Sequence, residues 1–227
     1  MHHLLLFLFL LSPNLVGLTA AGVEVTADLD NGADINELCA GCHGEYGQGG
    51  SEGEYPRLAG QPESFIIAQM HLFRDRKRPN MAMLEYVDER QMPDQDIIDI
   101  AAYLSRITLP TRLPPLKQGA EFDALARLEM TRKLLNIPRI EGDFKAGEDL
   151  YRKECQSCHG RDGAGNHRYG VPLLTGQYSN YLQRQVEKYR KGVRIHDPED
   201  PTDRLLNEFS DNELHNLFAF LSIADDP

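Results

Sequence analysis

The arrangement of four cysteines restricts how this chain can fold more than any other feature of its sequence. Residues 39–43 read CAGCH and residues 155–159 read CQSCH, and a glycine follows each histidine. Four cysteines in 227 residues are too few for a scaffold built on disulfides. The clusters therefore indicate a chemical role that each half of the chain carries out separately.

The two clusters belong to an internal repeat in which equivalent residues are 116 positions apart. The matching pairs include Gly49 and Gly165, Pro56 and Pro172, Leu58 and Leu174, Gln69 and Gln185, and Arg78 and Arg194. Toward the end of each half the spacing becomes 117, so the second half has gained one residue between Arg194 and Phe209. Self-similarity over about 70 residues indicates two copies of one domain.

Both halves show the apolar spacing of short helices, and neither shows the alternation that is typical of strands. The last helix of each half is expected to begin near Asp94 or Ser210, and Ser210 with Glu213 fits a capping box. The sequence therefore predicts an all-α fold with two domains, residues 22–108 and 140–227. Small domains of this kind have weak cores, so another group must fill the middle of each.

The C-x-x-C-H pattern predicts covalent attachment of a haem. On a helical turn, the two thiols can each add to one vinyl group, and the adjacent histidine can bind the iron from one side. Two other interpretations are a pair of disulfides and a single zinc ion held by both cysteine pairs. Neither explains why a histidine and then a Gly-rich loop follow each pair. We therefore expect two covalently bound haem c groups, which also supply the missing apolar filling.

Both halves resemble class I cytochrome c domains, and the whole chain resembles the tandem dihaem cytochromes c. The resemblance covers about residues 30–108 and 144–224. It rests on the C-x-x-C-H-G motif, on the P-x-L-x-G-Q segments at residues 56–61 and 172–177, and on the A-Y-L-S or A-F-L-S of the last helix.

The resemblance implies a role for several residues around each haem. The haem-attaching cysteines and proximal histidines are Cys39, Cys42 and His43 in the first half, and Cys155, Cys158 and His159 in the second. Pro56 and Pro172 match the proline whose carbonyl accepts a hydrogen bond from the proximal histidine, and such a bond orients the ring. The family also crosses a glycine of the first helix with an aromatic residue of the last. Two pairs fit this crossing: Gly147 with Phe220, and Gly32 with Tyr103.

The sixth ligand of each iron is expected in the loop before the last helix, where the family places a methionine. The first half has Met81 and Met83 in this loop. We favour Met83, because it lies at a suitable distance from the last helix, and Met81 is the competing candidate. Met70 and Met92 occupy apolar helical positions that are typical of a core.

The second half contains no methionine, which departs from the family pattern. Asp197 and Glu199 stand opposite Met81 and Met83. The best substitute is His196 in the same loop, because imidazole is a strong ligand for haem iron. The alternative is a solvated loop histidine and a second iron with five ligands. Because methionine ligation raises the reduction potential, the first haem is expected to have the higher potential.

The N-terminus predicts export. Residues 4–11 form an unbroken apolar run, and small residues follow at 19–22. This pattern is typical of a signal peptide over residues 1–21, cut near Ala20 or Ala21. The alternative is a membrane anchor that stays attached, although the apolar run is too short to span a bilayer well. The protein is therefore predicted to be periplasmic.

Residues 109–139 are predicted to be a linker with one amphipathic helix. The segment opens with prolines that favour an extended chain, and Pro138 ends it. Apolar residues recur at helical spacing at Phe122, Leu125, Leu128, Leu134 and Leu135. The linker has a net charge of +3, between domains of −9 and −5. It either lies across the two acidic domains or is a solvated helix.

The net charge of −11 argues against binding to nucleic acid, because phosphate contacts need a basic face. With six ligands on each iron, no substrate has a place to bind, so the leading hypothesis is an electron carrier between a redox protein donor and acceptor. An acidic surface steers such a carrier to basic docking faces, and a membrane-bound respiratory complex is another class of partner. The alternative is a haem enzyme in which the second iron is open to a peroxide, a sulfur compound or a small gas.

Overall fold

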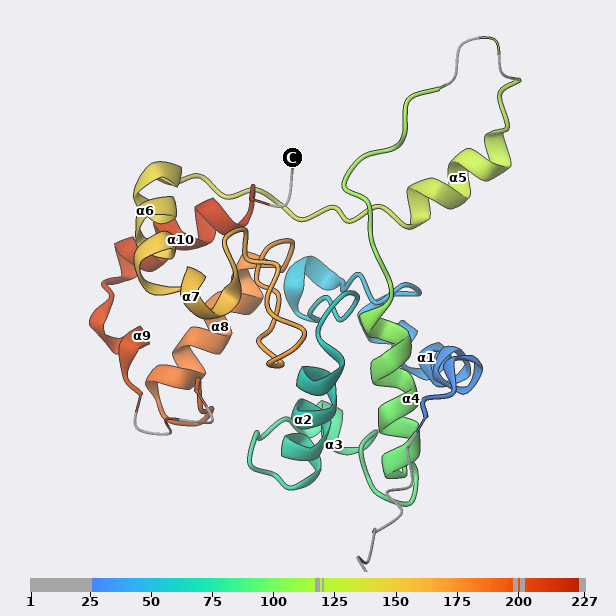
Figure 1. The fold of residues 1–227 in the computed structure, drawn as a ribbon, viewed down its shortest axis with the longest axis horizontal. Helices are drawn as coiled ribbons and strands as arrows, with labels where there is room; N and C mark the ends of the chain where they lie inside the picture. Colours follow the sequence, from blue (N-terminus) through green and yellow to red (C-terminus); the bar gives the residue numbers. More distant parts are fainter. Residues whose placement is uncertain (1–25, 117–118, 120, 198–199, 201–202, 225–227) are drawn as a thin grey trace, which may run out of the picture.

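The computed structural model describes residues 26–116, 119, 121–197, 200 and 203–224. Two helical domains lie side by side, and an extended segment with its own helix joins them (Figure 1). Within the described residues the regular elements are helices, and β-type pairing is limited to two isolated bridges. The predicted all-α class is confirmed. The predicted signal peptide at residues 1–21 lies outside the described residues.

The first domain starts where Asp28 caps a helix, since its carboxylate accepts hydrogen bonds from the backbone N–H groups of Asp30 and Asn31. Its elements, in chain order, are α1 (Leu29–His43), the 3₁₀ turn η1 (Ser51–Gly53), α2 (Glu63–Arg74), α3 (Met81–Leu84) and α4 (Asp94–Ser105). The helices α2 and α4 bury their apolar faces against each other. Met70 and Met92 belong to this core, as the sequence predicts.

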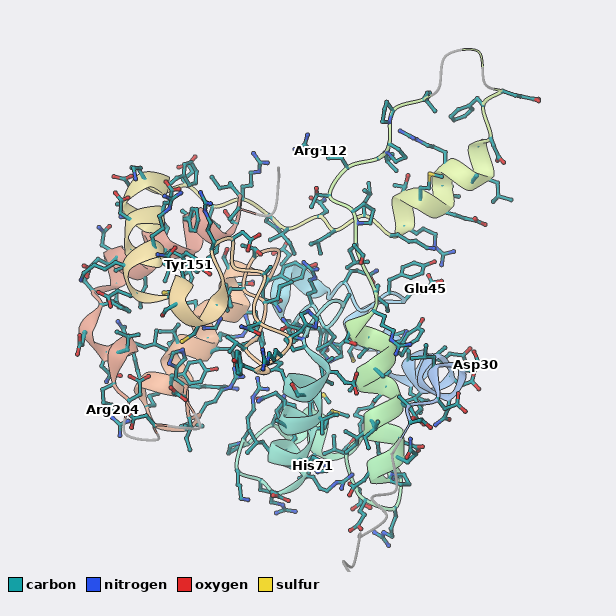
Figure 2. The ribbon with its side chains drawn as sticks, in the orientation of Figure 1. Asp30, Glu45, His71, Arg112, Tyr151 and Arg204 are labelled. Carbon is teal, nitrogen blue, oxygen red and sulfur yellow. The ribbon has the colours of Figure 1, made fainter. Side chains whose placement is uncertain are left out.

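The second domain repeats this order. Its elements are α6 (Phe144–Glu154), α7 (Gln156–His159), α8 (Ser179–Arg190), α9 (Leu205–Glu208) and α10 (Asp211–Leu221). The predicted capping box of Ser210 and Glu213 is present at the start of α10. Tyr151 is fully buried in the core of this domain, and Figure 2 labels it there.

In each domain, the first and last helices cross in close contact. A Cβ atom on Gly32 would lie 2.4 Å from the carbonyl oxygen of Asp99, and one on Gly147 would lie 2.0 Å from that of Asn216. The Cβ atoms of Tyr103 and Phe220 lie beside these glycines, so both predicted crossings are confirmed. No other residue type fits at either glycine without moving a helix.

The linker contains a helix that is shorter than its apolar pattern predicts. It forms over α5 (Ala124–Arg132), and the apolar residues Leu125 and Leu128 are 67% and 58% exposed. The helix stands away from both domains in Figure 1, while Arg132 pairs with Glu45 of the first domain. Its apolar face is thus not a packing face, and the solvated-helix interpretation fits the structure better. None of the helices in the described ranges is long and apolar enough to cross a membrane.

Two glutamines join the domains in a pseudo-twofold arrangement. Gln61 accepts a hydrogen bond from the backbone N–H of Leu173 at 3.0 Å and donates to its carbonyl at 3.1 Å. Gln177 makes the equivalent pair of bonds with the backbone of Arg57, each 2.9 Å long. Both glutamine side chains are buried, so the domains meet through a specific polar contact.

Candidate haem-binding sites

The four cysteine side chains are unpaired in the structure. Cys39 and Cys155 are partly buried, whereas Cys42 and Cys158 are exposed. Before a haem is attached, burial raises the pKa of the Cys39 and Cys155 thiols to about 11. The structure does not support the disulfide interpretation. Nor do the described residues include a group of three or more His, Cys, Asp or Glu side chains that could hold a metal ion.

Each histidine that is predicted to be the proximal ligand makes a hydrogen bond with the proline that the resemblance implies. The distance from His43 Nδ1 to the carbonyl oxygen of Pro56 is 2.9 Å, and that from His159 Nδ1 to the carbonyl oxygen of Pro172 is 3.0 Å. Burial lowers the pKa of both imidazoles, against the opposing effect of these hydrogen bonds. A neutral ring that donates from Nδ1 keeps its Nε2 lone pair available for a metal. This donor chemistry fits a haem iron in both domains.

The structure separates the two methionines that compete for the sixth position of the first iron. Met81 begins α3 and is 78% exposed. Met83, one half-turn further along, is partly buried and packs against the core of the first domain. Met83 is therefore the methionine that faces the interior of this domain.

His196 lies opposite His159, the predicted proximal ligand of the second domain. The ring centroids of His159 and His196 are 6.3 Å apart, and the ring planes differ by 27°. Two imidazoles on opposite sides of one metal ion, each bound through a nitrogen at about 2 Å, have centroids about 6 Å apart. His196 Nδ1 is 2.8 Å from Asp203 Oδ2, so this ring too is left with Nε2 as its metal-binding nitrogen. The spacing fits an iron held between two histidines.

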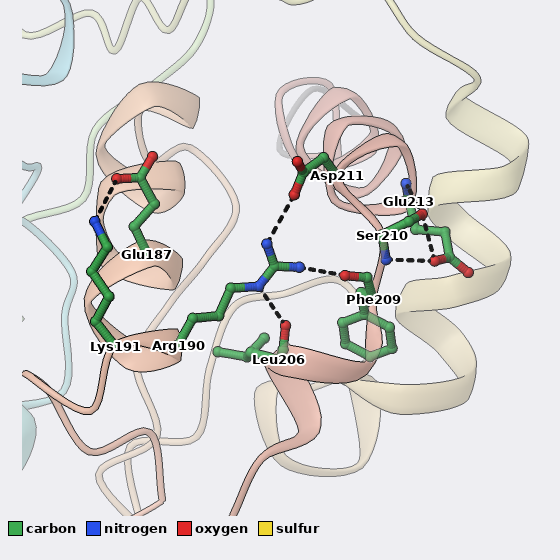
Figure 3. Close-up of polar contacts among 8 residues, drawn as sticks. All are labelled: Glu187, Arg190, Lys191, Leu206, Phe209, Ser210, Asp211 and Glu213. Carbon is green, nitrogen blue, oxygen red and sulfur yellow. Dashed lines mark hydrogen bonds and ion pairs between the residues drawn. The ribbon is translucent and has the colours of Figure 1, made fainter.

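The sequence analysis missed a pair of arginines that close the sixth-ligand loops; we call Arg74 and Arg190 the loop-closing arginines. Figure 3 shows Arg190 reaching from α8 to the start of α10, where it donates to the carbonyls of Leu206 and Phe209 and to the carboxylate of Asp211. Arg74 makes equivalent contacts in the first domain, with the carbonyls of Val87 and Met92 and the carboxylate of Asp94. The spacing of 116 between the two arginines is the signal that could have revealed them.

A second arginine pair lies between the domains. Arg78 donates to Gln69 at 2.8 Å and to Gln185 at 3.1 Å, and Arg194 donates to the same two side chains at 3.1 and 2.8 Å. Burial lowers the pKa of Arg78, and the neighbouring Arg194 lowers it further. Two guanidinium groups are thus buried together at the domain interface, with neutral glutamines as shared partners.

Comparisons with known proteins agree with this geometry. The sequence profile described as "Cytochrome c" matches residues 29–108 and again residues 144–224. Cytochrome c4 of Pseudomonas aeruginosa is 30% identical over 193 residues, which are 85% of this chain and 84% of that protein. A protein of Thiomonas intermedia described as "Thiosulfate dehydrogenase electron acceptor" is 29% identical over 160 residues, 70% of this chain and 66% of that protein.

The fold also matches a solved structure. Reduced recombinant cytochrome c4 from Pseudomonas stutzeri superimposes with a TM-score of 0.67 at 23% identity, over 86% of this chain and 98% of that chain. Together with the family profile, this confirms the predicted tandem arrangement of two cytochrome c domains. Each domain has one C-x-x-C-H site, so the protein carries two covalently bound haem c groups. The chain belongs to the cytochrome c family, as a dihaem electron-transfer protein with one cytochrome c domain in each half.

Proposed function

We propose that this protein is a periplasmic electron carrier whose two irons have different axial ligands. In this proposal, His43 and Met83 bind the first iron, and His159 and His196 bind the second. The cysteine pairs of the two motifs hold the haems. Export through the signal peptide at residues 1–21 is part of the proposal.

The spacing of the two histidine rings in the second domain is the observation that carries this proposal. The 6.3 Å between the centroids of His159 and His196 matches the length of an imidazole–metal–imidazole unit. A hydrogen bond donated by Nδ1 orients each ring: His159 donates to the carbonyl of Pro172, and His196 donates to the carboxylate of Asp203. A solvated loop histidine would not need this second anchor.

The chain's own residues favour electron transfer over catalysis. The haems supply one-electron chemistry when they are bound. The proline carbonyls hold the proximal rings in fixed positions, and preorganised groups of this kind need little rearrangement when the charge changes. If Met83 and His196 complete both coordination spheres, neither iron has an open position for a substrate.

The ligand difference also gives electron flow a direction. A haem with a methionine ligand has a higher potential than one with two imidazoles. Electrons therefore enter at the second domain and leave from the first. The net charge of −11 favours partners with basic docking faces, and association with them slows as the salt concentration rises. The relative described as an acceptor for thiosulfate dehydrogenase supports a dehydrogenase as the class of donor.

Spectroscopy of the oxidised holoprotein tests the ligation. We expect two low-spin haems, of which only the first shows the charge-transfer band of a methionine–iron bond. Met83→Ala should remove that band, whereas Met81→Ala should leave it unchanged. His196→Ala should make the second haem high-spin and leave the first as it was. A wild-type second haem that is already high-spin would contradict the proposal.

Binding of carbon monoxide separates the carrier from the enzyme. The reduced wild-type protein should bind carbon monoxide slowly and incompletely, because both irons are occupied. His196→Ala should bind it rapidly at one haem. Rapid, complete binding at one haem of the wild-type protein would instead favour an enzyme that acts on a peroxide, a sulfur compound or a small gas at the second iron.

A further inference from the structure

In each domain, one peptide group makes hydrogen bonds through both its carbonyl and its N–H. The carbonyl of Pro56 accepts the hydrogen bond from His43 Nδ1 at 2.9 Å. The N–H of the same peptide group belongs to Arg57 and donates to Gln177 Oε1, also at 2.9 Å. Gln177 is a residue of the second domain. The proximal histidine of the first domain is therefore one peptide group away from a side chain of the other domain.

The second domain contains the equivalent connection. The carbonyl of Pro172 accepts from His159 Nδ1 at 3.0 Å, and the N–H of the following Leu173 donates to Gln61 Oε1 at 3.0 Å. Gln61 belongs to the first domain. The two connections thus cross the domain interface in opposite directions.

We propose that Gln61 and Gln177 are positioning residues that act crosswise: each glutamine tunes the proximal histidine, and so the reduction potential, of the haem in the opposite domain. This rests on the two haem sites and their proximal histidines. It does not depend on Met83 or His196, so the failure of those assignments would leave it standing.

Polarisation through the shared peptide group gives the mechanism. An N–H group that donates to a glutamine oxygen makes the carbonyl of the same peptide a better acceptor, and linked hydrogen bonds strengthen one another. Gln61 and Gln177 are 4% and 3% exposed, so water does not replace them easily. Each amide group also donates to the carbonyl of the residue that it accepts from, which fixes the side chain in place.

The direction of the effect follows from the chemistry of the ligand. A stronger hydrogen bond from Nδ1–H makes the imidazole more electron-rich, and a more basic ligand favours the oxidised iron. Each glutamine therefore lowers the potential of the opposite haem. Removing one glutamine should raise the potential of that haem and leave the haem of its own domain unchanged.

The experiment uses the full-length holoprotein with Gln177→Met or Gln61→Met, because methionine has a similar volume but accepts no comparable hydrogen bond. A redox titration followed by the NMR signals of each haem reports the two potentials separately. Gln177→Met should shift the electron-sharing equilibrium between the haems toward the first by about two- to five-fold. Gln61→Met should shift it toward the second by a similar factor.

A matched control separates this effect from a looser domain interface. Tyr181→Phe removes the hydrogen bond from Arg78 across the same interface, and it touches neither connection. It should leave the electron-sharing equilibrium unchanged. Exchange of the Nδ1 proton gives a second readout: it should accelerate at His43 in Gln177→Met and at His159 in Gln61→Met.

Any one of four results would overturn the proposal. Each glutamine variant could shift the haem of its own domain, both variants could shift both haems equally, or Tyr181→Phe could reproduce the glutamine effects. Unchanged potentials together with unchanged proton exchange would overturn it as well.

Discussion

The two halves of the molecule differ most in the loop before the last helix, where we propose that the sixth ligand of each iron lies. In the first domain a short helix turns Met83 toward the core. In the second, a loop with one extra residue carries His196, and Asp203 anchors its ring. The loop-closing arginines nevertheless make the same contacts in both halves. A loop that is fastened at its base can change its ligand and its length without disturbing the helices around it.

The cores of the halves differ as well. The inner face of α2 buries Ile66, Met70 and Phe73, whereas that of α8 buries Gln185 and Val186. The second domain therefore has less aliphatic packing of its own, and its structure should depend more on the haem.

The largest effect is expected when a cysteine pair is removed. Replacing Cys39 and Cys42 by serine, or Cys155 and Cys158 by serine, should reduce the covalent haem content from two groups to one. The second replacement should also unfold its domain more completely, because that domain has the weaker apolar core. Haem content by mass spectrometry and helix content by circular dichroism check this. Two covalent haems in either variant would refute the assignment of the motifs.

Exchange of the sixth ligands gives the next effect. His196→Met should raise the potential of the second haem, and Met83→His should lower that of the first, each by on the order of 100 mV. A redox titration of the two variants and the wild type measures this. Making both variants at once should reverse the order of the two potentials. If the order is unchanged in the double variant, the ligands do not set the direction of electron flow.

The helix crossing is expected to exclude a side chain in both halves, and more strictly in the second, where the approach is closer. Gly147→Ala should lower the free energy of unfolding of the second domain by about 3 kcal/mol, and Gly32→Ala that of the first by about 2 kcal/mol, because each new methyl group meets a backbone carbonyl. Chemical denaturation of the holoprotein measures both values.

Gly41 provides the control for these glycines. A Cβ atom there has no neighbour within 4 Å, and the second half has Ser157 at the equivalent position. Gly41→Ser should change the stability by less than about 0.5 kcal/mol. A loss at Gly41 as large as at Gly32 would show that close packing is not the cause.

The smallest effect concerns a buried acid that one half has and the other lacks. Asp99 accepts the backbone N–H of Asp28 at 2.8 Å, and Asn216 accepts that of Asp143 at 3.0 Å. Burial raises the pKa of Asp99, but hydrogen bonds from Asn31, Asp28 and Gln95 outweigh it, and the net pKa lies below the ordinary 3.8. The stability that Asp99 contributes is present above its unfolded pKa and is lost as the pH falls through its lower folded pKa.

Asp99→Asn makes the first half resemble the second at this position. It should lower the stability of the first domain by about 1 kcal/mol at neutral pH and weaken its loss of stability in acid. Denaturant unfolding as a function of pH measures both changes. The second domain serves as the internal control. If its stability at low pH also changes, the effect does not come from Asp99.

Local patterns in the sequence predicted the helices and the proximal side of each haem site. The C-x-x-C-H motif, the proline segments and the crossing glycines are short signals with a fixed geometry, and the repeat doubles each of them. The linker helix shows the limit of such patterns. Its apolar spacing continued to Leu135, but the helix ends at Arg132. Leu135 is buried beside Ala59 of the first domain, whereas Leu125 and Leu128 on the helix stay exposed.

Contacts between distant residues were beyond the reach of the sequence. Gln61 and Gln177 belong to the family motif, but no local pattern predicts that each side chain binds the backbone of the other domain. The hydrogen bond between Asp203 and His196 could likewise be recognised only from the folded structure. The loop-closing arginines could have been found from the repeat, because their partners at Asp94 and Asp211 repeat with them.

The arginine pair at the domain interface has an electrical consequence. Arg78 and Arg194 place two positive charges inside the protein, where the surrounding water screens them poorly. Like charges repel each other, so this pair carries an electrostatic cost at the domain interface, which the side-chain oxygens of Gln69 and Gln185 offset.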